Sequence, residues 1–312
     1  MDKIEILKDR ATLLASARTF FSLRNITEVD CPLLSASASV DAHIDLIPAI
    51  TFNGTRYLHS SPEYGMKRLL SEGMGDIYQL SHVFRDGECG AKHNPEFMMA
   101  EWYRLNFSFD DIIAETLDFI RLFLGDLPAS TITYREAFIK YAGFDYVHIS
   151  TAGLVDFLHH HQIQIDPGLD TNDKDTLLNL IIGTVIEPCL GQNELCALTY
   201  YPATQAALAR AVKRDDEAAA ERFEVYFRGV ELANGYHELA DANEQRERLL
   251  EANEERIKSR KNPLPIDLHF LKALELGLPD CCGVAVGFDR LMMLRHDQKQ
   301  IAAVIPFDWS VA

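Results

Sequence analysis

The 312-residue chain lacks any run of about 18 apolar residues, the length that a membrane-spanning helix requires. Charged residues recur between Asp2 and Arg10, so the N-terminal segment also lacks the apolar core of a signal peptide. The six cysteines include no Cys-x-x-Cys pair and no histidine partner at the spacing of a zinc site. We therefore expect a cytoplasmic protein with free thiols and with no membrane contact, disulfide framework or structural metal.

Basic residues are scarce as well. The chain has 30 lysines and arginines against 47 aspartates and glutamates, which gives a formal net charge of −17. Because nucleic-acid-binding proteins attract phosphates with basic surfaces, this charge disfavours DNA or tRNA as a partner. The two basic clusters are Lys213–Arg214 and residues 256–261, and the second ends a segment of mixed charge. We interpret that segment as a helix with a solvated face.

The chain also lacks internal repeats and long glycine- or serine-rich linkers. Apolar spacing predicts a helix from Ile4 to Leu23 and then an extended segment that stops at Pro32. Further helices are predicted over residues 109–124, 150–161 and 173–187, and strands over residues 76–85, 96–105, 221–227 and 230–236. Strands interrupted by helical blocks indicate the α+β class, with an antiparallel β-sheet flanked by helices.

Two local signals refine this expectation. Asn53 and Gly54 predict a hairpin turn, because both residue types tolerate positive φ angles. Ser61 is the predicted N-cap of the next helix and Pro62 its first residue.

Residues 84–104, FRDGECGAKHNPEFMMAEWYR, form the most informative stretch. Arg85 precedes a polar loop that joins two predicted strands. Alternation along the second strand turns Phe97, Glu101 and Tyr103 to one face. Core packing would explain the two aromatic residues alone, but an unpaired carboxylate such as that of Glu101 is costly to bury. This face therefore predicts a ligand surface with an aromatic platform and polar contacts.

Residues 221–239, ERFEVYFRGVELANGYHEL, predict a hairpin with a two-residue turn at residues 228–229. With that turn, Tyr226 lies opposite Glu231, and Glu224 lies diagonally across from Glu231 on the same face. Two carboxylates this close need a cation, and Mg²⁺ is a natural candidate. By pattern alone, an exposed acidic hairpin explains these residues equally well.

Three polar residues further along this strand have the opposite alternation: Asn234, Tyr236 and Glu238. A regular pleat would not turn them toward the two carboxylates. Gly235 could break the strand and turn them back.

Together with residues 283–294, GVAVGFDRLMML, the stretch at residues 84–104 resembles motifs 2 and 3 of the class II aminoacyl-tRNA synthetases. The first helix and the extended segment after it resemble motif 1, which implies a homodimer. The resemblance implies a single catalytic domain that activates a carboxylic acid with ATP and Mg²⁺. Its implied parts are motif 1 at about 4–34, motif 2 at about 76–107, motif 3 at about 283–296 and a mostly helical insertion at about 144–220.

The implied reaction is an in-line attack of a carboxylate oxygen on the α-phosphorus of ATP, so the protein supplies position and positive charge. The resemblance places Arg85 between the substrate carboxylate and the α-phosphate, since a planar guanidinium can bind both. It places Arg290 at the γ-phosphate and against the adenine, whose other face Phe97 covers. These two arginines are the implied catalytic residues. The implied ATP-binding set is Arg85, Asp86, Gly87, Glu88, His93, Asn94, Phe97, Glu231, Leu232, Gly287 and Arg290, and the implied metal ligands are Glu224 and Glu231.

Among class II enzymes, the segments EFMMAEWYR and ELANGYHEL are most similar to the lysine-specific branch, in which carboxylates receive the two ammonium groups of the substrate. Several acids in one pocket select a cationic substrate, because a neutral one would leave them unpaired. The implied carboxylates are those of Glu63, Glu101 and Glu238. The other implied substrate-binding residues are Ser61, Pro62, Tyr103, Asn234, Tyr236 and Ala285.

No anticodon-binding domain is expected, because the helix of motif 1 begins at about Ile4. Along nearly its whole length the chain resembles the elongation factor P lysine ligases, which are stand-alone paralogues of lysyl-tRNA synthetase. The resemblance implies activation of (R)-β-lysine as an adenylate and its transfer to a lysine ε-amino group of elongation factor P. Ala285 stands where lysyl-tRNA synthetases have glycine, so its methyl group would occupy space beside the amino acid. The alternative is that Ala285 is a tolerated small residue.

Gly87 departs from the pattern of motif 2, which has a glutamate at this position. Either Asp86 or Glu88 takes over the contact to ATP, or the loop is reshaped. We interpret His93 as a residue of this loop near phosphate, and residues 159–161, three consecutive histidines, as the end of an amphipathic helix.

Two other functions remain open from the sequence. A truncated lysyl-tRNA synthetase-like enzyme would acylate tRNA. A non-catalytic pseudo-synthetase would only bind a ligand, but the retained Arg85, Glu224, Glu231 and Arg290 argue against it. An asparagine synthetase of the class II fold fits less well, because its substrate is anionic and the expected pocket is acidic.

Overall fold

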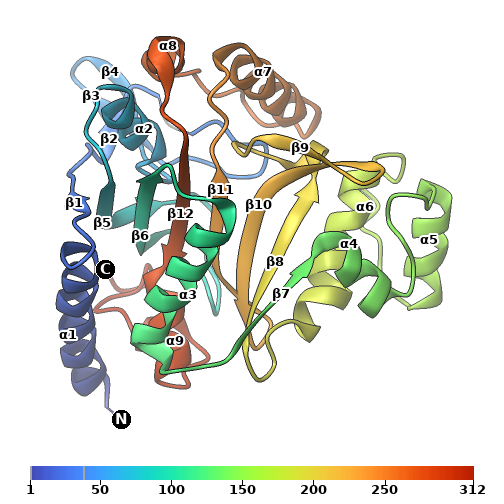
Figure 1. The fold of residues 1–312 in the computed structure, drawn as a ribbon, viewed down its shortest axis with the longest axis horizontal. Coiled ribbons are helices and arrows are strands. Elements are labelled where there is room, and N and C mark those ends of the chain that lie inside the picture. Colours follow the sequence, from blue (N-terminus) through green and yellow to red (C-terminus); the bar gives the residue numbers. More distant parts are fainter. Residues whose placement is uncertain (1, 38) are drawn as a thin grey trace. The chain divides into compact units, whose positions relative to one another are not determined.

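Two units make up the chain in the computed structural model, which describes residues 2–37 and 39–312 (Figure 1). The first unit consists of the residues up to Gly125 together with His237–Ala312, and the second is Asp126–Tyr236. Each combines helices with strands that pair mainly antiparallel, so the predicted α+β class is confirmed. None of the helices in the described ranges is long and apolar enough to cross a membrane.

Four strands form the main sheet of the first unit. They are β1 (Thr27–Glu28), β5 (Ile77–Phe84), β6 (Glu96–Leu105) and β12 (Cys281–Gly287). β6 lies between β5 and β12 and pairs antiparallel with both, while β1 pairs parallel with β5. The strands predicted at 76–85 and 96–105 are confirmed. The sequence does not predict β12, because its run of small residues has no alternation of polar and apolar types.

The helices of the first unit are α1 (Lys3–Ser22), α2 (Glu63–Ser71), α3 (Phe109–Leu124), α7 (Ala242–Lys258), α8 (Leu268–Gly277) and α9 (Phe288–Arg295). Aromatic residues join α1 and α3 to one face of the sheet. The fully buried indole ring of Trp102 on β6 lies 5.3 Å from the ring of Phe21 and 5.2 Å from that of Phe119. Because side chains alternate along a strand, Glu101 and Tyr103 point to the opposite face.

A small sheet with the order β2 (Leu34–Ser35), β4 (Gly54–Leu58), β3 (Pro48–Thr51) also belongs to this unit. Its hairpin is confirmed, but the prediction that Asn53 and Gly54 form the turn is wrong. Thr51 pairs with Gly54, so Phe52 and Asn53 are the turn residues. Of the two residues predicted to form the turn, Gly54 has a positive φ angle, 105°, and Asn53 does not. The start of α2 is also shifted by one residue, because Pro62 is the N-cap and the helix begins at Glu63.

The second unit has five strands: β7 (Ala129–Thr133), β8 (Leu195–Pro202), β9 (Ala211–Arg214), β10 (Glu217–Phe227) and β11 (Val230–His237). β10 pairs antiparallel with β8, β9 and β11, and β7 pairs parallel with β8. Its helices are α4 (Tyr134–Ala137), α5 (Thr151–His160) and α6 (Lys174–Ile181), with π-helical turns at Phe138–Ala142 and Ile182–Ile186. Helices occupy residues 151–160 and 174–186 of the expected helical insertion, but they do not occupy its last part, where β8, β9 and the start of β10 lie.

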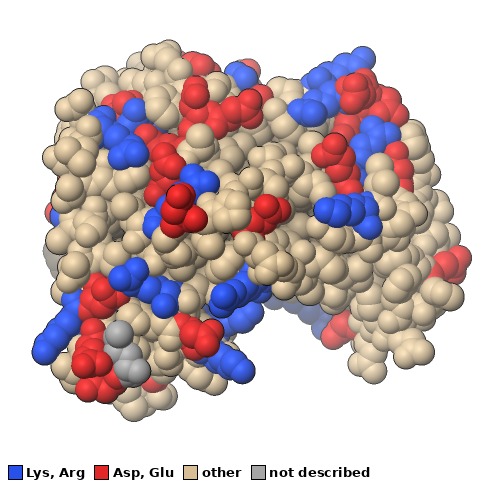
Figure 2. All heavy atoms as spheres, turned by 60° about the horizontal axis from the view of Figure 1, so that its bottom comes forward, with Lys and Arg blue, Asp and Glu red and all other residues tan. Residues whose placement is uncertain are grey.

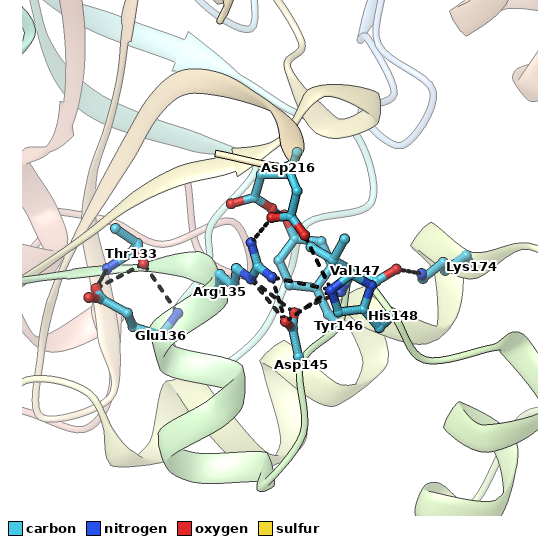
Figure 3. Close-up of polar contacts among 10 residues, drawn as sticks. Thr133, Arg135, Glu136, Asp145, Tyr146, Val147, His148, Lys174 and Asp216 are labelled. Carbon is cyan, nitrogen blue, oxygen red and sulfur yellow. Dashed lines mark hydrogen bonds and ion pairs between the residues drawn. The ribbon is translucent and has the colours of Figure 1, made fainter. Parts of the chain in front are cut away.

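A charged network in the second unit joins three segments of the chain (Figure 3). Arg135 on α4 donates to Asp145 at 2.6 Å and to Asp216, in the turn between β9 and β10, at 2.5 Å. Asp145 in turn accepts from the backbone N–H of Val147 at 3.1 Å, and Lys174 on α6 donates to the Val147 carbonyl oxygen at 3.2 Å. The Arg135 guanidinium therefore holds the loop after the π-helical turn Phe138–Ala142 to the turn between β9 and β10.

The charged helix that was predicted to have a solvated face is α7. The prediction that its charged residues are solvated is wrong for Arg256. Its side chain is buried and donates to the carbonyl oxygens of Asp41, Ile44 and Asn262 and to the Asp45 carboxylate. Lys261 pairs with the same carboxylate at 2.8 Å. The basic cluster therefore fixes an acidic loop of its own unit. On the face that Figure 2 shows, lysine and arginine side chains lie interspersed with acidic ones.

A buried ion pair holds α1 to α9. Arg10 on α1 donates to one carboxylate oxygen of Asp289, and the other oxygen accepts from the backbone N–H of Met98 on β6 at 2.8 Å. Asp289 is 2% exposed and Arg10 is 7% exposed. The carboxylate thus ties two helices and a strand together next to Arg290.

Replacing this carboxylate is expected to destabilise the protein strongly. Asp289→Ala leaves a buried guanidinium and a buried N–H without their acceptor, and we expect a loss of about 3–5 kcal/mol in the free energy of unfolding. Urea denaturation followed by circular dichroism measures it. The matched control is Glu275→Ala, which removes a solvent-exposed partner of Arg246 and should cost no more than about 1 kcal/mol. Equal losses in the two variants would contradict the assignment.

Candidate active site

The polar face of the first unit's sheet carries a buried carboxylate. Glu101 on β6 is 2% exposed, and it accepts from the Tyr103 hydroxyl at 2.8 Å and from the Ser61 hydroxyl at 2.7 Å. Strand register places Ala285 directly opposite Glu101, and Gly283 opposite Tyr103. These predicted residues therefore share one surface, as the alternation of β6 indicates.

Helix α2 brings a second carboxylate and a buried ammonium to this surface. The Nζ atom of Lys67 lies 2.7 Å from Glu63, one turn earlier on the helix, and 2.5 Å from Glu238. Lys67 is completely buried, and Glu63 and Glu238 are 8% and 5% exposed. The three implied carboxylates thus belong to one buried cluster, but two of them are bridged by a lysine of the protein itself.

Glycine at position 283 makes room for this cluster. A Cβ atom there would lie 2.5 Å from Oε1 of Glu238 and 2.4 Å from a ring carbon of Tyr103. Both contacts are far shorter than real Cβ contacts. Oε1 of Glu238 is buried and has no hydrogen-bond donor among the residues that the structure describes. It is therefore an acceptor that a ligand's ammonium group could satisfy.

Burial makes two carboxylates of this cluster, those of Glu101 and Glu238, hard to ionise. Desolvation, and next the charge of Glu63, raises the pKa of Glu101 to about 8. Desolvation also raises the pKa of Glu238 to about 7, against the opposing effect of Lys67. The Lys67 ammonium stays charged, because the two carboxylates beside it raise its pKa despite burial. A bound cation would favour the ionised carboxylates and release their protons.

The predicted arginine of motif 2 lies at the end of β5. The Arg85 guanidinium lies 5.1 Å from the ring centre of Phe97 and 3.7 Å from the Glu88 carboxylate. Its buried Nε–H has no acceptor in the described part of the chain, so it can donate to a ligand oxygen. Gly87 has a φ of 76°, which favours glycine, and Asp86 pairs through its backbone with Asp45. Of the two candidates to replace the missing glutamate, the structure thus brings Glu88 to the arginine.

Arg290 on the first turn of α9 contacts the motif 2 loop, with Gly287 as the N-cap of that helix. Its Nη2 lies 2.7 Å from Nε2 of His93. Burial, and next the charge of Arg290, lowers the pKa of His93, so a neutral imidazole accepts this hydrogen bond. The predicted ATP contact of Asn94 has no such support, since its side chain donates to the Glu96 carbonyl oxygen and accepts from the Trp309 N–H.

In the second unit, the hairpin β10–β11 has the predicted turn. Arg228 and Gly229 have φ angles of 52° and 67°, and Tyr226 lies opposite Glu231. The register then shifts, because Val225 pairs with Ala233 and Tyr226 with Glu231, which leaves Leu232 as an extra residue.

This bulge corrects the expectation for the rest of the strand. Beyond it, Asn234 lies opposite Glu224 and Tyr236 lies opposite Arg222, so these residues share the face of Glu231 after all. The extra residue at Leu232, and not Gly235, produces the change. Oδ1 of Asn234 is buried and has no hydrogen-bond donor among the described residues.

The family implies Mg²⁺, and the hairpin offers suitable donors. Glu224 and Glu231 lie on one face, and carboxylate oxygens are the ligands that Mg²⁺ prefers. Glu224 accepts from Arg222 at 2.7 Å through one oxygen, and from Tyr201 and Tyr226 through the other. About one lone pair of four is left for a metal. The donor chemistry fits Mg²⁺, which would share Glu224 with the guanidinium of Arg222.

Three residues that support the predicted site residues were not predicted from the sequence. They are Lys67, Asp289 and Arg222, and each forms a close ion pair in the structure. Only Lys67 carried a usable signal, because it follows Glu63 by four residues on a predicted helix, the spacing of a helical ion pair. The partner of Asp289 is 279 residues away, so no local pattern could indicate it.

The fold and this set of residues define a class II synthetase. Residues 2–309 match the family model described as tRNA synthetases class II (D, K and N), and the chain belongs to that family. It is 43% identical over 310 residues to a protein of Haemophilus influenzae (strain PittGG) named elongation factor P--(R)-beta-lysine ligase, covering 97% of this chain and 95% of that protein. Proteins with the same name from Actinobacillus succinogenes and Pasteurella multocida are 41% and 40% identical over the same shares.

A methyl group at Gly283 is expected to damage the amino-acid site. In Gly283→Ala the methyl must displace Glu238 or the ring of Tyr103, and a shift of about 1 Å can cost roughly 100-fold in rate. Amino-acid-dependent ATP–pyrophosphate exchange measures the loss. Gly183→Ala is the matched control, because a Cβ atom there meets nothing within 4 Å. Wild-type exchange in Gly283→Ala would contradict this geometry.

The raised pKa values predict how amino-acid binding depends on pH. A cationic ligand needs ionised carboxylates, so the KM for the amino acid should fall as the pH rises from about 6 to about 8.5, through the pKa values of Glu238 and Glu101. In the ligand-free protein these carboxyl groups favour the folded state at a pH below the pKa that they have in the unfolded chain. This contribution to the free energy of unfolding is lost as the pH rises toward about 8, the pKa of Glu101 in the folded protein. Exchange kinetics across the pH range test it. A flat KM would contradict it.

Proposed function

We propose that this protein is an ATP-dependent, AMP-forming ligase that activates (R)-β-lysine and transfers it to a lysine ε-amino group of elongation factor P. Membership of the class II family supports the adenylation half of this proposal. The name shared by relatives at 40–43% identity over nearly the whole chain supports the amino acid and the protein acceptor.

The observation that carries the proposal is the buried cluster of three carboxylates, which come from α2, from β6 and from the residue that follows β11. Among the residues that the structure describes, Glu63, Glu101 and Glu238 share one ammonium group, that of Lys67. Burying this excess of negative charge is costly unless a ligand neutralises it. A diamino acid has the two cations that this cluster lacks, whereas an anionic or neutral amino acid would leave it uncompensated.

Arg85 then binds the substrate carboxylate and the α-phosphate, which holds the attacking oxygen in line with the phosphorus. Its free Nε–H and its position above Phe97 support this role. Arg290, held by neutral His93, contacts the γ-phosphate. Mg²⁺ on Glu224 and Glu231 would neutralise phosphate charge when bound. Ser61 and Tyr103 orient Glu101 toward an ammonium group of the substrate.

We further propose that the protein is a single catalytic domain, that it forms a homodimer through the motif 1 helix, that it is cytoplasmic, and that tRNA, DNA and membranes are not its partners. The acidic net charge of −17 supports a protein acceptor over a polyanionic one.

The acceptor is tested by mass spectrometry. The enzyme is incubated with ATP, Mg²⁺ and either α-lysine, (R)-β-lysine or (S)-β-lysine, and then with elongation factor P or tRNA. We expect elongation factor P to gain one lysine residue, most rapidly with (R)-β-lysine, while tRNA gains none. A gain on tRNA alone would identify a synthetase, and the absence of exchange with every isomer would identify a pseudo-synthetase.

Removing the arginine clamp is expected to abolish activation. Arg85→Ala should lower lysine-dependent ATP–pyrophosphate exchange by about 100-fold or more, since it removes the donors aimed at the reacting oxygens. Arg18→Ala, which removes an exposed arginine paired with Glu28, is the matched control and should keep wild-type exchange. If Arg85→Ala also keeps it, the clamp lies elsewhere.

A further inference from the structure

Lys67 is an unusual feature in a site that accepts cations. A lysine side chain here occupies the place between two carboxylates that a substrate ammonium group could otherwise take. It is completely buried and belongs to α2, whose first turn also provides Glu63. Its ammonium nitrogen lies 5.9 Å from the centre of the Phe270 ring on α8.

The charges around Lys67 can be counted. Glu63, Glu101 and Glu238 provide three carboxylates and Lys67 provides one ammonium, so the fully ionised cluster carries two net negative charges. Two is also the number of ammonium groups in a diamino acid whose carboxylate is bound by Arg85. In the described part of the chain, the other titratable groups that face this cluster are Cys31, Tyr64, Tyr103, His237 and Cys281.

We propose that Lys67 is an internal counter-cation that sets the charge of the amino-acid site, so that three carboxylates accept two substrate ammonium groups and no more. This inference rests on the proposed function for the identity of the substrate. Lys67 acts through Glu63 and Glu238 and does not touch the reacting atoms, so it is a positioning residue. Its salt bridges also fix the Glu63 and Glu238 carboxylates, each through one oxygen. The other oxygen of Glu238, the buried Oε1, is left for the ligand.

The role follows from the chemistry of buried charges. Without the ammonium, three buried carboxylates repel one another, and the least costly response is to bind a proton. A cation that enters the site must then displace that proton. Lys67 therefore spares the substrate one proton release, and its loss makes binding more dependent on pH.

The test uses Lys67→Met, which keeps the stem and removes the charge. At a pH of about 7 we expect the KM for lysine to rise by about 10-fold or more, corresponding to at least one pKa unit at Glu238. The KM for ATP should change little, and raising the pH should recover the lysine KM. Calorimetry in two buffers should show more protons released on lysine binding than in the wild type.

Two further variants make the test specific. Lys67→Met/Glu238→Gln removes one charge of each sign, so it should release fewer protons on lysine binding than Lys67→Met. It keeps the net charge of the cluster and leaves only Glu63 without its ion pair, so it remains testable if Lys67→Met fails to fold. Lys272→Met removes an exposed lysine of α8 and changes the net charge equally, and it should behave as the wild type.

A ligand-free measurement separates this inference from the proposed function. In protein labelled with ¹³C at the glutamate carboxyl, the Glu238 resonance is identified by its loss in Glu238→Gln. We expect its pKa to be higher in Lys67→Met than in the wild type. An unchanged pKa, or an unchanged pH dependence of the lysine KM, overturns the role of Lys67. If the wild type activates no lysine isomer, the proposed function fails while this titration still tests Lys67.

Discussion

The alternation of one strand, β6, is the constraint on which the rest of the first unit depends. Trp102 points to an aromatic core shared with α1 and α3, while its neighbours Glu101 and Tyr103 point to the polar face. The apolar face fixes the register of the strand, because a slip by one residue would place the carboxylate in the aromatic core and turn the indole to the polar face. The core therefore determines where the acidic site lies.

The polar face is then assembled from segments that are far apart in the chain. Glu63 and Lys67 come from α2, Gly283 and Ala285 come from β12, and Glu238 directly follows β11. Each carboxylate is costly to bury alone, and the structure offsets part of this cost with one ammonium and two hydroxyl groups. The part of the desolvation cost that is not offset raises the pKa values of Glu101 and Glu238. A cationic ligand that binds there would relieve this cost, which favours its binding.

Much of the site could be predicted because its residues lie in short segments with clear patterns. Phe97, Glu101 and Tyr103 follow from alternation, and the turn at Arg228–Gly229 follows from its residue types. The position of Asn234 could not be predicted, because the extra residue at Leu232 reverses the alternation and bulges depend on the pairing of both strands. The same holds for Arg256, whose mixed-charge surroundings indicate solvent but whose guanidinium is bound by loop carbonyl groups.

By itself the sequence determined the family, the α+β class and the acidic character of the amino-acid site, because these depend on residue types and on spacings within single helices and strands. Only the tertiary structure decided which charges meet. The bridge from Lys67 to Glu238 and the pair between Arg10 and Asp289 join residues separated by most of the chain. A buried charge is stable only beside its partner, and the choice of partner depends on how the strands and helices pack, which no local pattern specifies.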